Sequence, residues 1–298
     1  MSQALRLCFE CAVPRFQAQN NHKMKTTTDT LFDEHGRRVP FEGMRAFNSV
    51  SRRYYQLNQP DIQFDTVLRR MNKHAGLAES ISAHQFESAC LDLMKTAKED
   101  ASIRDICKGV HVPFICPKFV DDIDLGEEFE QHWLAAVGSS FAAMFPQYHF
   151  KSTLQGDAPS LRGTLTLAKG ARYEHFLRAR RQGVIVGWYF PTALQEYDTA
   201  SQRGQMRTLP LPEMLVLSGG FEAAAALVGS PDLLMNTETY PPVLCLSAFE
   251  HIDKRLMLCF KAYGLSLEFW LLTQMLVPGI TQVSEQWTGG LTLFTVIR

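Results

Sequence analysis

The spacing of apolar residues changes period twice along the chain, and this change constrains the fold more than any other feature. Residues 4–13 alternate between apolar and polar side chains, which predicts a strand with one buried face. Residues 61–145 carry apolar side chains mostly at helical spacing, and strand-like segments return from about residue 147. The first strand must then pair with strands that follow the helical block. We therefore expect an α+β fold with a long helical insertion.

Three segments follow from this pattern. Residues 1–60 are expected to form the first half of the α+β core, residues 61–146 a mostly helical insertion, and residues 147–298 the remainder of the core. Residues 17–36 are polar without periodicity and predict a long exposed loop. The clearest helix spans 82–98, with a capping box at its start. Other helices are expected at 44–57, 172–181, 221–228 and 265–276, and later strands at 148–154, 161–168, 184–190, 214–218, 243–247 and 291–297.

Composition and targeting signals favour a cytoplasmic protein without a membrane segment. Arg6 and Glu10 interrupt the stretch where a signal peptide needs an apolar core. No stretch of roughly 20 residues is apolar enough for a transmembrane helix. The seven cysteines are scattered, which indicates no disulfide framework. Cys8 and Cys11 would point to opposite faces of the first strand, so we interpret them as structural thiols and expect no metal site.

The sequence carries no recognisable catalytic motif. It lacks His-Glu-x-x-His, a Walker lysine, Gly-x-Ser-x-Gly and Gly-x-Gly-x-x-Gly. The acidic run at 121–128 is typical of a solvated helix start. We therefore expect no catalytic residue, no metal and no cofactor.

Basic residues are distributed unevenly, although the whole chain has a formal net charge of −1. Residues 1–60 carry nine Lys/Arg against five Asp/Glu, and residues 151–210 carry nine against four. Aromatic residues are interleaved with these charges, namely Phe41, Phe47, Tyr54, Tyr55, Tyr173, Phe176, Trp188 and Tyr189. Cations neutralise phosphates and aromatic rings stack on bases, so the pattern favours binding of single-stranded nucleic acid. A solvated basic face above core aromatics is the structural alternative.

Residues 26–41 (TTTDTLFDEHGRRVPF) follow the first predicted strand and lead into residues 43–53 (GMRAFNSVSRR). This order resembles the start of the RAMP superfamily, in which a first strand and loop lead to an arginine-bearing helix. More narrowly, it resembles the backbone subunit of class 1 CRISPR surveillance complexes, especially the type IV kind. Arg45 matches the first arginine of that helix, and Arg52 and Arg53 match its closing pair.

The sequence departs from the family pattern at Ala46, where a glycine is expected, and the resemblance covers only about residues 4–55. It implies a modified ferredoxin-like, RNA-recognition-type core and a filament subunit of an antiviral ribonucleoprotein. Its implied partners are a guide RNA, target nucleic acid through guide pairing, copies of itself and other effector subunits. The helical insertion would be a solvent-side or target-facing lobe.

The candidate RNA-binding residues combine this resemblance with the basic clusters. They are Lys23, Lys25, Arg45, Arg52 and Arg53, with Arg178, Arg180 and Arg181 as secondary candidates. Type III relatives cleave target RNA with a loop aspartate, and Asp29 and Asp33 lie in a comparable loop. The type IV likeness implies no such cleavage. Two other classes stay open, an α+β enzyme with an unrecognised active site and a plasmid or phage structural assembly protein.

Reversing the charge of Arg45 and Arg52 together should weaken RNA binding strongly and leave the fold intact. The two residues are seven apart on the predicted helix, opposite its apolar face, so they project in nearly the same direction. RNA affinity and circular dichroism of the double variant would check this expectation. Unchanged affinity in a folded variant would contradict the assignment.

Overall fold

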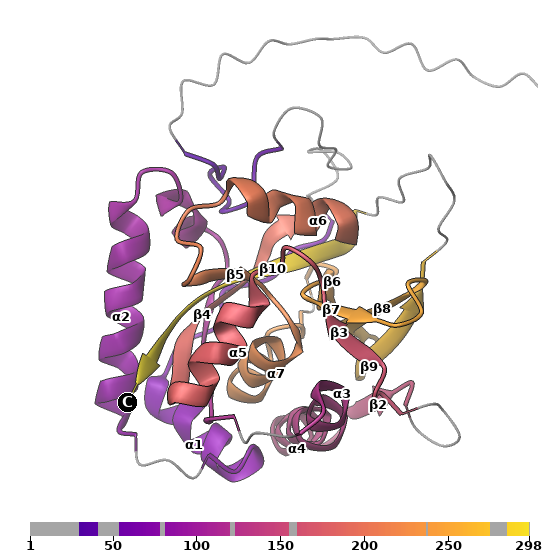
Figure 1. The fold of residues 1–298 in the computed structure, drawn as a ribbon. Helices are drawn as coiled ribbons and strands as arrows, with labels where there is room; N and C mark the ends of the chain where they lie inside the picture. The colour runs from indigo at the N-terminus through magenta and orange to yellow at the C-terminus, as the bar shows by residue number, and fades with distance from the viewer. Residues whose placement is uncertain are drawn as a thin grey trace, which may run out of the picture.

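The computed structural model describes residues 30–40, 54–77, 81–119, 123–154, 160–236, 238–274 and 285–297. It is an α+β fold built on a mixed eight-stranded sheet, in which seven strands run in the order β1-β4-β10-β6-β8-β9-β2 and β5 pairs with β10. Strands β3 and β7 form a separate two-stranded sheet. Figure 1 shows α2 along one side of the molecule and strands β8, β9 and β2 on the other.

The α-helices are α1 Phe64–His74, α2 Ala83–Glu99, α3 Leu125–Glu128, α4 Ala135–Met144, α5 Tyr173–Gln182, α6 Thr199–Gln205 and α7 Gly220–Gly229. Shorter helical pieces are η2 Arg104–Lys108, η3 Phe129–Leu134 and η4 Met206–Thr208. The strands are β1 Val112–Cys116, β2 His149–Ser152, β3 Leu165–Leu167, β4 Val184–Gln195, β5 Leu215–Leu217, β6 Val243–Cys245, β7 Phe249–His251, β8 Leu256–Tyr263, β9 Ser266–Thr273 and β10 Trp287–Ile297.

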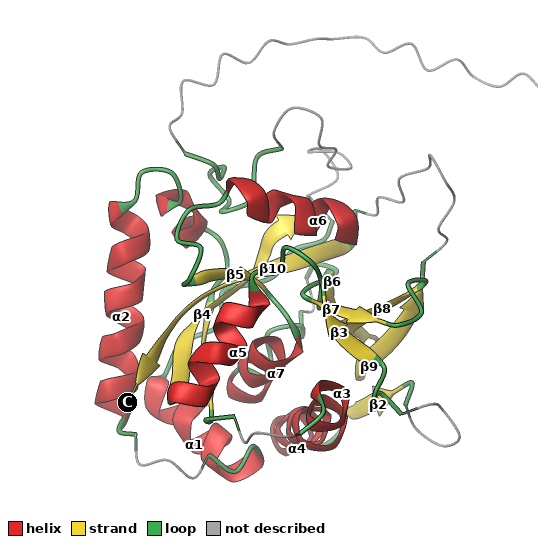
Figure 2. Cartoon of the chain, in the orientation of Figure 1, coloured by secondary structure: helices red, strands yellow, loops and turns green. Residues whose placement is uncertain are grey.

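Strand β4 lies between β1 and β10, and all 12 of its residues are buried. Successive side chains of a strand point to opposite faces, so both faces of β4 must be covered. The Trp188 indole donates to the Cys90 carbonyl of α2 at 2.7 Å, which places α2 on one face. The next residue, Tyr189, interacts electrostatically with Glu222 of α7, so α7 covers the opposite face of β4. Figure 2 shows α2, α5 and α7 beside β4 and β10, whereas α3 and α4 lie near β2 and β9.

The predicted helical insertion is not a lobe separate from the sheet. Strand β1 lies within it and pairs antiparallel with β4, from Val112 opposite Tyr189 to Cys116 opposite Ile185. Pro113 has no N–H to donate, which an edge strand such as β1 tolerates. Side chains of the block join the same hydrophobic core as the sheet. The capping box predicted at Ser82 is confirmed at the start of α2.

The predicted helix at 265–276 is wrong for its described part. Strands β8 and β9 form an antiparallel hairpin from Leu256 opposite Thr273 to Tyr263 opposite Ser266. Gly264 begins the two-residue turn with a φ of 57°, a conformation that glycine adopts without strain. A continuous apolar run fits a buried strand as well as a buried helix, so periodicity alone could not decide between them.

Part of the predicted exposed loop at 17–36 is packed against the core. Phe32 is buried, and its segment is bridged to Arg38. The Arg38 guanidinium donates to the carbonyls of Leu31 and Val39, each at 2.9 Å, and to Thr208 Oγ1 at 3.0 Å. The first two bonds close the segment on itself, and the third connects it to η4, so the Arg38 side chain has a structural role. The predicted strand at 4–13 and most of the predicted helix at 44–57 lie outside the described residues.

A buried carboxylate joins α7, α5 and β10. Glu222 Oε1 accepts from the Gly219 N–H at 2.6 Å and from Thr292 Oγ1 at 3.2 Å. Its other oxygen accepts a short hydrogen bond from the Tyr173 hydroxyl. Burial disfavours the charged form and raises the pKa of Glu222 from 4.5 to about 6, although these hydrogen bonds oppose the shift.

The variant Glu222→Gln should remove a pH dependence from the free energy of unfolding. The carboxyl binds its proton more tightly in the folded protein than in the unfolded chain. Its contribution to the free energy of unfolding is therefore full below pH 4.5 and is lost as the pH rises to about 6. Relative to the variant, the wild type should therefore lose about 2 kcal/mol between these pH values. Urea unfolding of both proteins across this range measures the difference. A stability difference that does not vary with pH would contradict the shifted pKa.

Candidate nucleic-acid interface

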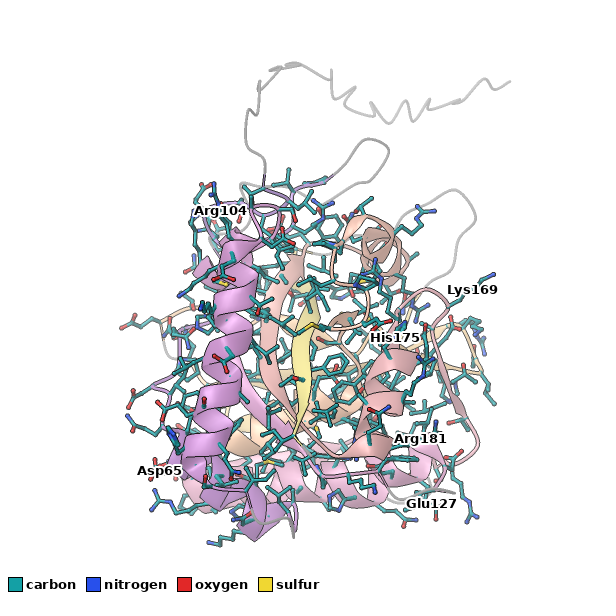
Figure 3. All side chains as sticks on the ribbon, turned by 60° about the vertical axis from the view of Figure 1, so that its left-hand side comes forward. Asp65, Arg104, Glu127, Lys169, His175 and Arg181 are labelled. Atoms are coloured by element: carbon teal, nitrogen blue, oxygen red, sulfur yellow. The ribbon has the colours of Figure 1, made fainter. Side chains whose placement is uncertain are left out.

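Helix α5 separates its side chains into a buried and an exposed face. Tyr173, Phe176 and Arg180 are buried, at positions that recur every three to four residues. Arg178 and Arg181 are exposed and lie three residues apart, so they project from neighbouring positions on the surface. Figure 3 shows Arg181 and His175 on the same side of the molecule as Lys169. Two of the predicted phosphate ligands therefore stand at the surface on one helix.

Arg180 was expected at this surface, and the structure corrects that expectation. Its side chain is only 1% exposed, and Nη2 donates to Glu128 Oε1 at 2.9 Å. Nε donates to the Pro117 carbonyl at 3.1 Å, and the guanidinium lies 4.8 Å from the centroid of the Phe221 ring. The positive charge of Arg180 is thus paired with Glu128 inside the protein, so Arg180 is not available at the surface to bind a phosphate.

The remaining predicted basic residues, Lys23, Lys25, Arg45, Arg52 and Arg53, lie outside the described residues. The structure also shows which of the aromatic residues expected to stack on bases are at the surface. Tyr173, Phe176, Trp188 and Tyr189 are buried in the core, so they offer no ring to a base. Tyr54 is exposed, whereas Tyr55 is half-buried and lies against the Tyr240 ring.

The described aspartate of the N-terminal loop closes a turn. Asp33 Oδ1 accepts from the backbone N–H groups of His35 at 2.9 Å and Arg37 at 2.8 Å. Gly36 has a φ of 71°, and a Cβ there would lie 2.3 Å from the Gly109 nitrogen, so only glycine fits. Asp29 lies outside the described residues. Asp124 of the acidic run caps α3 by accepting from the Gly126 and Glu127 N–H groups, as expected for a helix start.

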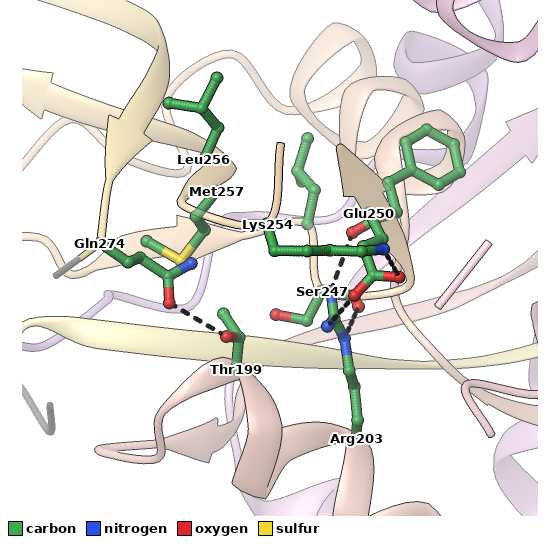
Figure 4. A pocket seen from close by; sticks show the side chains of 10 residues that line it. Thr199, Arg203, Ser247, Glu250, Lys254, Leu256, Met257 and Gln274 are labelled. Carbon is green, nitrogen blue, oxygen red and sulfur yellow. Dashed lines mark hydrogen bonds and ion pairs between the residues drawn. The ribbon is translucent and has the colours of Figure 1, made fainter. Parts of the chain in front are cut away.

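A small polar hollow lies between α6 and the turn before β8 (Figure 4). The Arg203 guanidinium donates to Glu250 Oε1 at 2.8 Å and to the Ser247 carbonyl at 2.9 Å. Lys254 Nζ lies 2.5 Å from the other oxygen of Glu250. The hollow has a volume of about 30 Å³, enough for about one water molecule. Both cations of the hollow pair with the single carboxylate of Glu250, so we interpret it as a structural ion-pair cluster.

Sequence reasoning missed a larger hollow between α1 and α4. Its volume is about 270 Å³, and Arg69, Arg70, Lys73 and His74 of α1 contribute to its lining. The signal was present in the sequence, because residues at i, i+1, i+4 and i+5 of a helix share one side. The predicted fold did not show that α4 would stand beside this side of α1.

Within the described residues, no group of three or more His, Cys, Asp or Glu side chains is arranged to hold a metal ion. No helix in the same ranges is long and apolar enough to cross a membrane. Cys90, Cys107, Cys116, Cys245 and Cys259 are free thiols. Comparison with known proteins gave no match to a family model, to a curated protein or to a solved structure.

The variants Arg180→Met and Arg178→Met should separate the structural arginine from the surface arginine. Removing Arg180 leaves the Glu128 carboxylate, which is 10% exposed, without its countercharge. Loss of one partner of a buried ion pair costs about 3–5 kcal/mol, whereas an exposed substitution changes stability by about 0.5 kcal/mol or less. Chemical unfolding measures both values. Equal stability of the two variants would contradict the structural role of Arg180.

Proposed function

We propose that this chain is a non-catalytic RNA-binding subunit, the guide-RNA-binding backbone of a CRISPR effector complex. The observation that carries the RNA-binding part is the exposed pair Arg178 and Arg181 on α5. The resemblance of residues 26–53 to the RAMP superfamily supplies the narrower assignment. The proposal includes a cytoplasmic location and an assembly in which copies of the protein bind along one guide, as the likeness implies.

The mechanism of binding is electrostatic. Guanidinium groups neutralise phosphates without reading sequence, and base pairing of the guide then selects the target. The anchoring of α5 supports this role, because buried Tyr173, Phe176 and Arg180 fix the helix from which Arg178 and Arg181 project. A fixed helix loses little conformational entropy when it binds, so fewer favourable contacts are needed.

The ferredoxin-like description of the core belongs to the same proposal. It is supported by the antiparallel order β1-β4-β10, with α5 and α7 on one face. Tyr173 of α5 donates to Glu222 of α7, which holds these two helices together on that face. The mixed sheet extends beyond this unit through β6, β8, β9 and β2, and these strands would be additions to the core.

The double variant R178E/R181E should bind single-stranded RNA at least about tenfold more weakly than the wild type at physiological salt. Loss of two phosphate contacts should also reduce the slope of log affinity against log salt by about 1.4. Fluorescence anisotropy with a labelled single-stranded RNA at several salt concentrations measures both quantities.

A matched control is available on α2. Lys95 and Lys98 are exposed and also three residues apart, so K95E/K98E makes the same change in net charge at the same spacing. This control should keep most of the RNA affinity, since its charges lie on another helix. Equal losses in the two variants would show a non-specific charge effect and contradict the α5 site.

The assembly part of the proposal needs a separate readout. Absorbance at 260 and 280 nm, with light scattering before and after ribonuclease treatment, should reveal an oligomer that holds RNA. An RNA-free monomer would favour the α+β enzyme or another class of protein over the filament subunit.

A further inference from the structure

Every charged side chain that lines the hollow between α1 and α4 in the described residues is cationic. Arg69, Arg70 and Lys73 contribute three positive charges, and no carboxylate lies among the described lining residues. Its volume of about 270 Å³ approaches the lower end of the range for small-ligand sites, about 300 Å³. Other lining residues are Thr66, His74, Ser140, Ala143 and Met144.

The two arginines are held in place by their neighbours. Arg70 Nη1 donates to the Gly229 carbonyl at 2.7 Å, at the carboxyl end of α7. Arg69 Nη2 donates to Thr66 Oγ1 at 2.8 Å and lies 3.3 Å from the exposed Asp65 carboxylate. A guanidinium has five N–H donors, so each arginine keeps donors beyond these contacts. Fixed donors reduce the entropy lost when an anion binds.

The local electrostatic potential is positive enough to affect a neighbouring histidine. His74 Nδ1 lies 2.8 Å from Ser139 Oγ of α4. Burial is the largest cause that lowers the pKa of His74, and the charges of Lys73 and Arg70 lower it further. The described lining of the hollow contains no carboxylate that could offset these two charges.

The helix dipole explains only part of this arrangement. Cations in the last turn of a helix, such as Lys73, stabilise its negative end, and Arg70 does the same for α7. Neither role requires Arg69, Arg70 and Lys73 to line one hollow. A carboxylate is satisfied by a single guanidinium fork, whereas a phosphate presents more acceptor oxygens and more charge.

We propose that the hollow between α1 and α4 binds a phosphate group. The group could belong to a small phosphomonoester or to the phosphodiester chain of RNA, which share the chemistry recognised here. This proposal does not depend on the proposed function, because its residues are on α1 and those of the RNA surface are on α5.

The test follows the His74 imidazole by NMR in full-length, histidine-labelled protein, at constant ionic strength. The probes are inorganic phosphate, adenosine 5′-monophosphate, a cytidine trinucleotide without terminal phosphate, and acetate. The His74 signal is identified by its loss in His74→Gln. A bound phosphate should raise the pKa of His74, because it neutralises the adjacent cations.

The variant Lys73→Ala should weaken phosphate binding by about tenfold, the usual effect of losing one charge-assisted hydrogen bond. Lys73 is exposed, so this variant should fold, and Lys95→Ala on α2 should bind like the wild type. A response to inorganic phosphate or adenosine 5′-monophosphate without a response to the trinucleotide assigns the site to small phosphorylated ligands. A response to the trinucleotide assigns it to RNA. Either result supports the site.

The absence of a response to every phosphate probe would overturn the proposal. An equal response to acetate, or equal affinity of Lys73→Ala and wild type, would also overturn it. These failures are distinguishable from failure of the proposed function, since R178E/R181E leaves the α1 hollow intact.

Discussion

The structure depends on covering both faces of β4. Burying 12 consecutive strand residues removes a large apolar surface from water, but each buried backbone group then needs a partner. Strands β1 and β10 supply these partners along its two edges. Pro191 lies within β4 where the register with β10 shifts, between the pairs Gly289–Leu194 and Leu291–Phe190, so its missing N–H coincides with an irregular ladder.

Polar groups inside the protein connect the elements that cover this strand. Glu222 links α7 with α5 and β10, and the Arg180–Glu128 pair links α5 with α3. Each group is costly to bury alone and is therefore paired. This pairing affects function, because an arginine that pairs with a buried carboxylate cannot also contact a ligand at the surface. Charge counted along a sequence overstates the charge that a ligand can meet.

The sequence predicted local structure well where a signal was both periodic and long. The apolar spacing and capping box of α2 predicted its type and, to within one residue, its bounds. Short or continuous apolar runs gave mixed results. The strands predicted at 214–218 and 243–247 are present as β5 and β6, whereas β1 and β9 lie in segments that were expected to be helical. Segment β1 is a strand because it pairs with β4, which is distant in the sequence. Segment β9 is a strand because it pairs with β8 across a turn.

The candidate sites divide in the same way. Composition and spacing determined that residues 151–210 are basic, that α5 is amphipathic, and that α1 carries four basic residues on one side. Only the tertiary structure decided that Arg180 is buried, that Arg178 and Arg181 are exposed together, and that α4 stands beside the basic side of α1. The physical reason is that burial and ion pairing depend on which distant element packs against a side chain, and local sequence does not encode that neighbour.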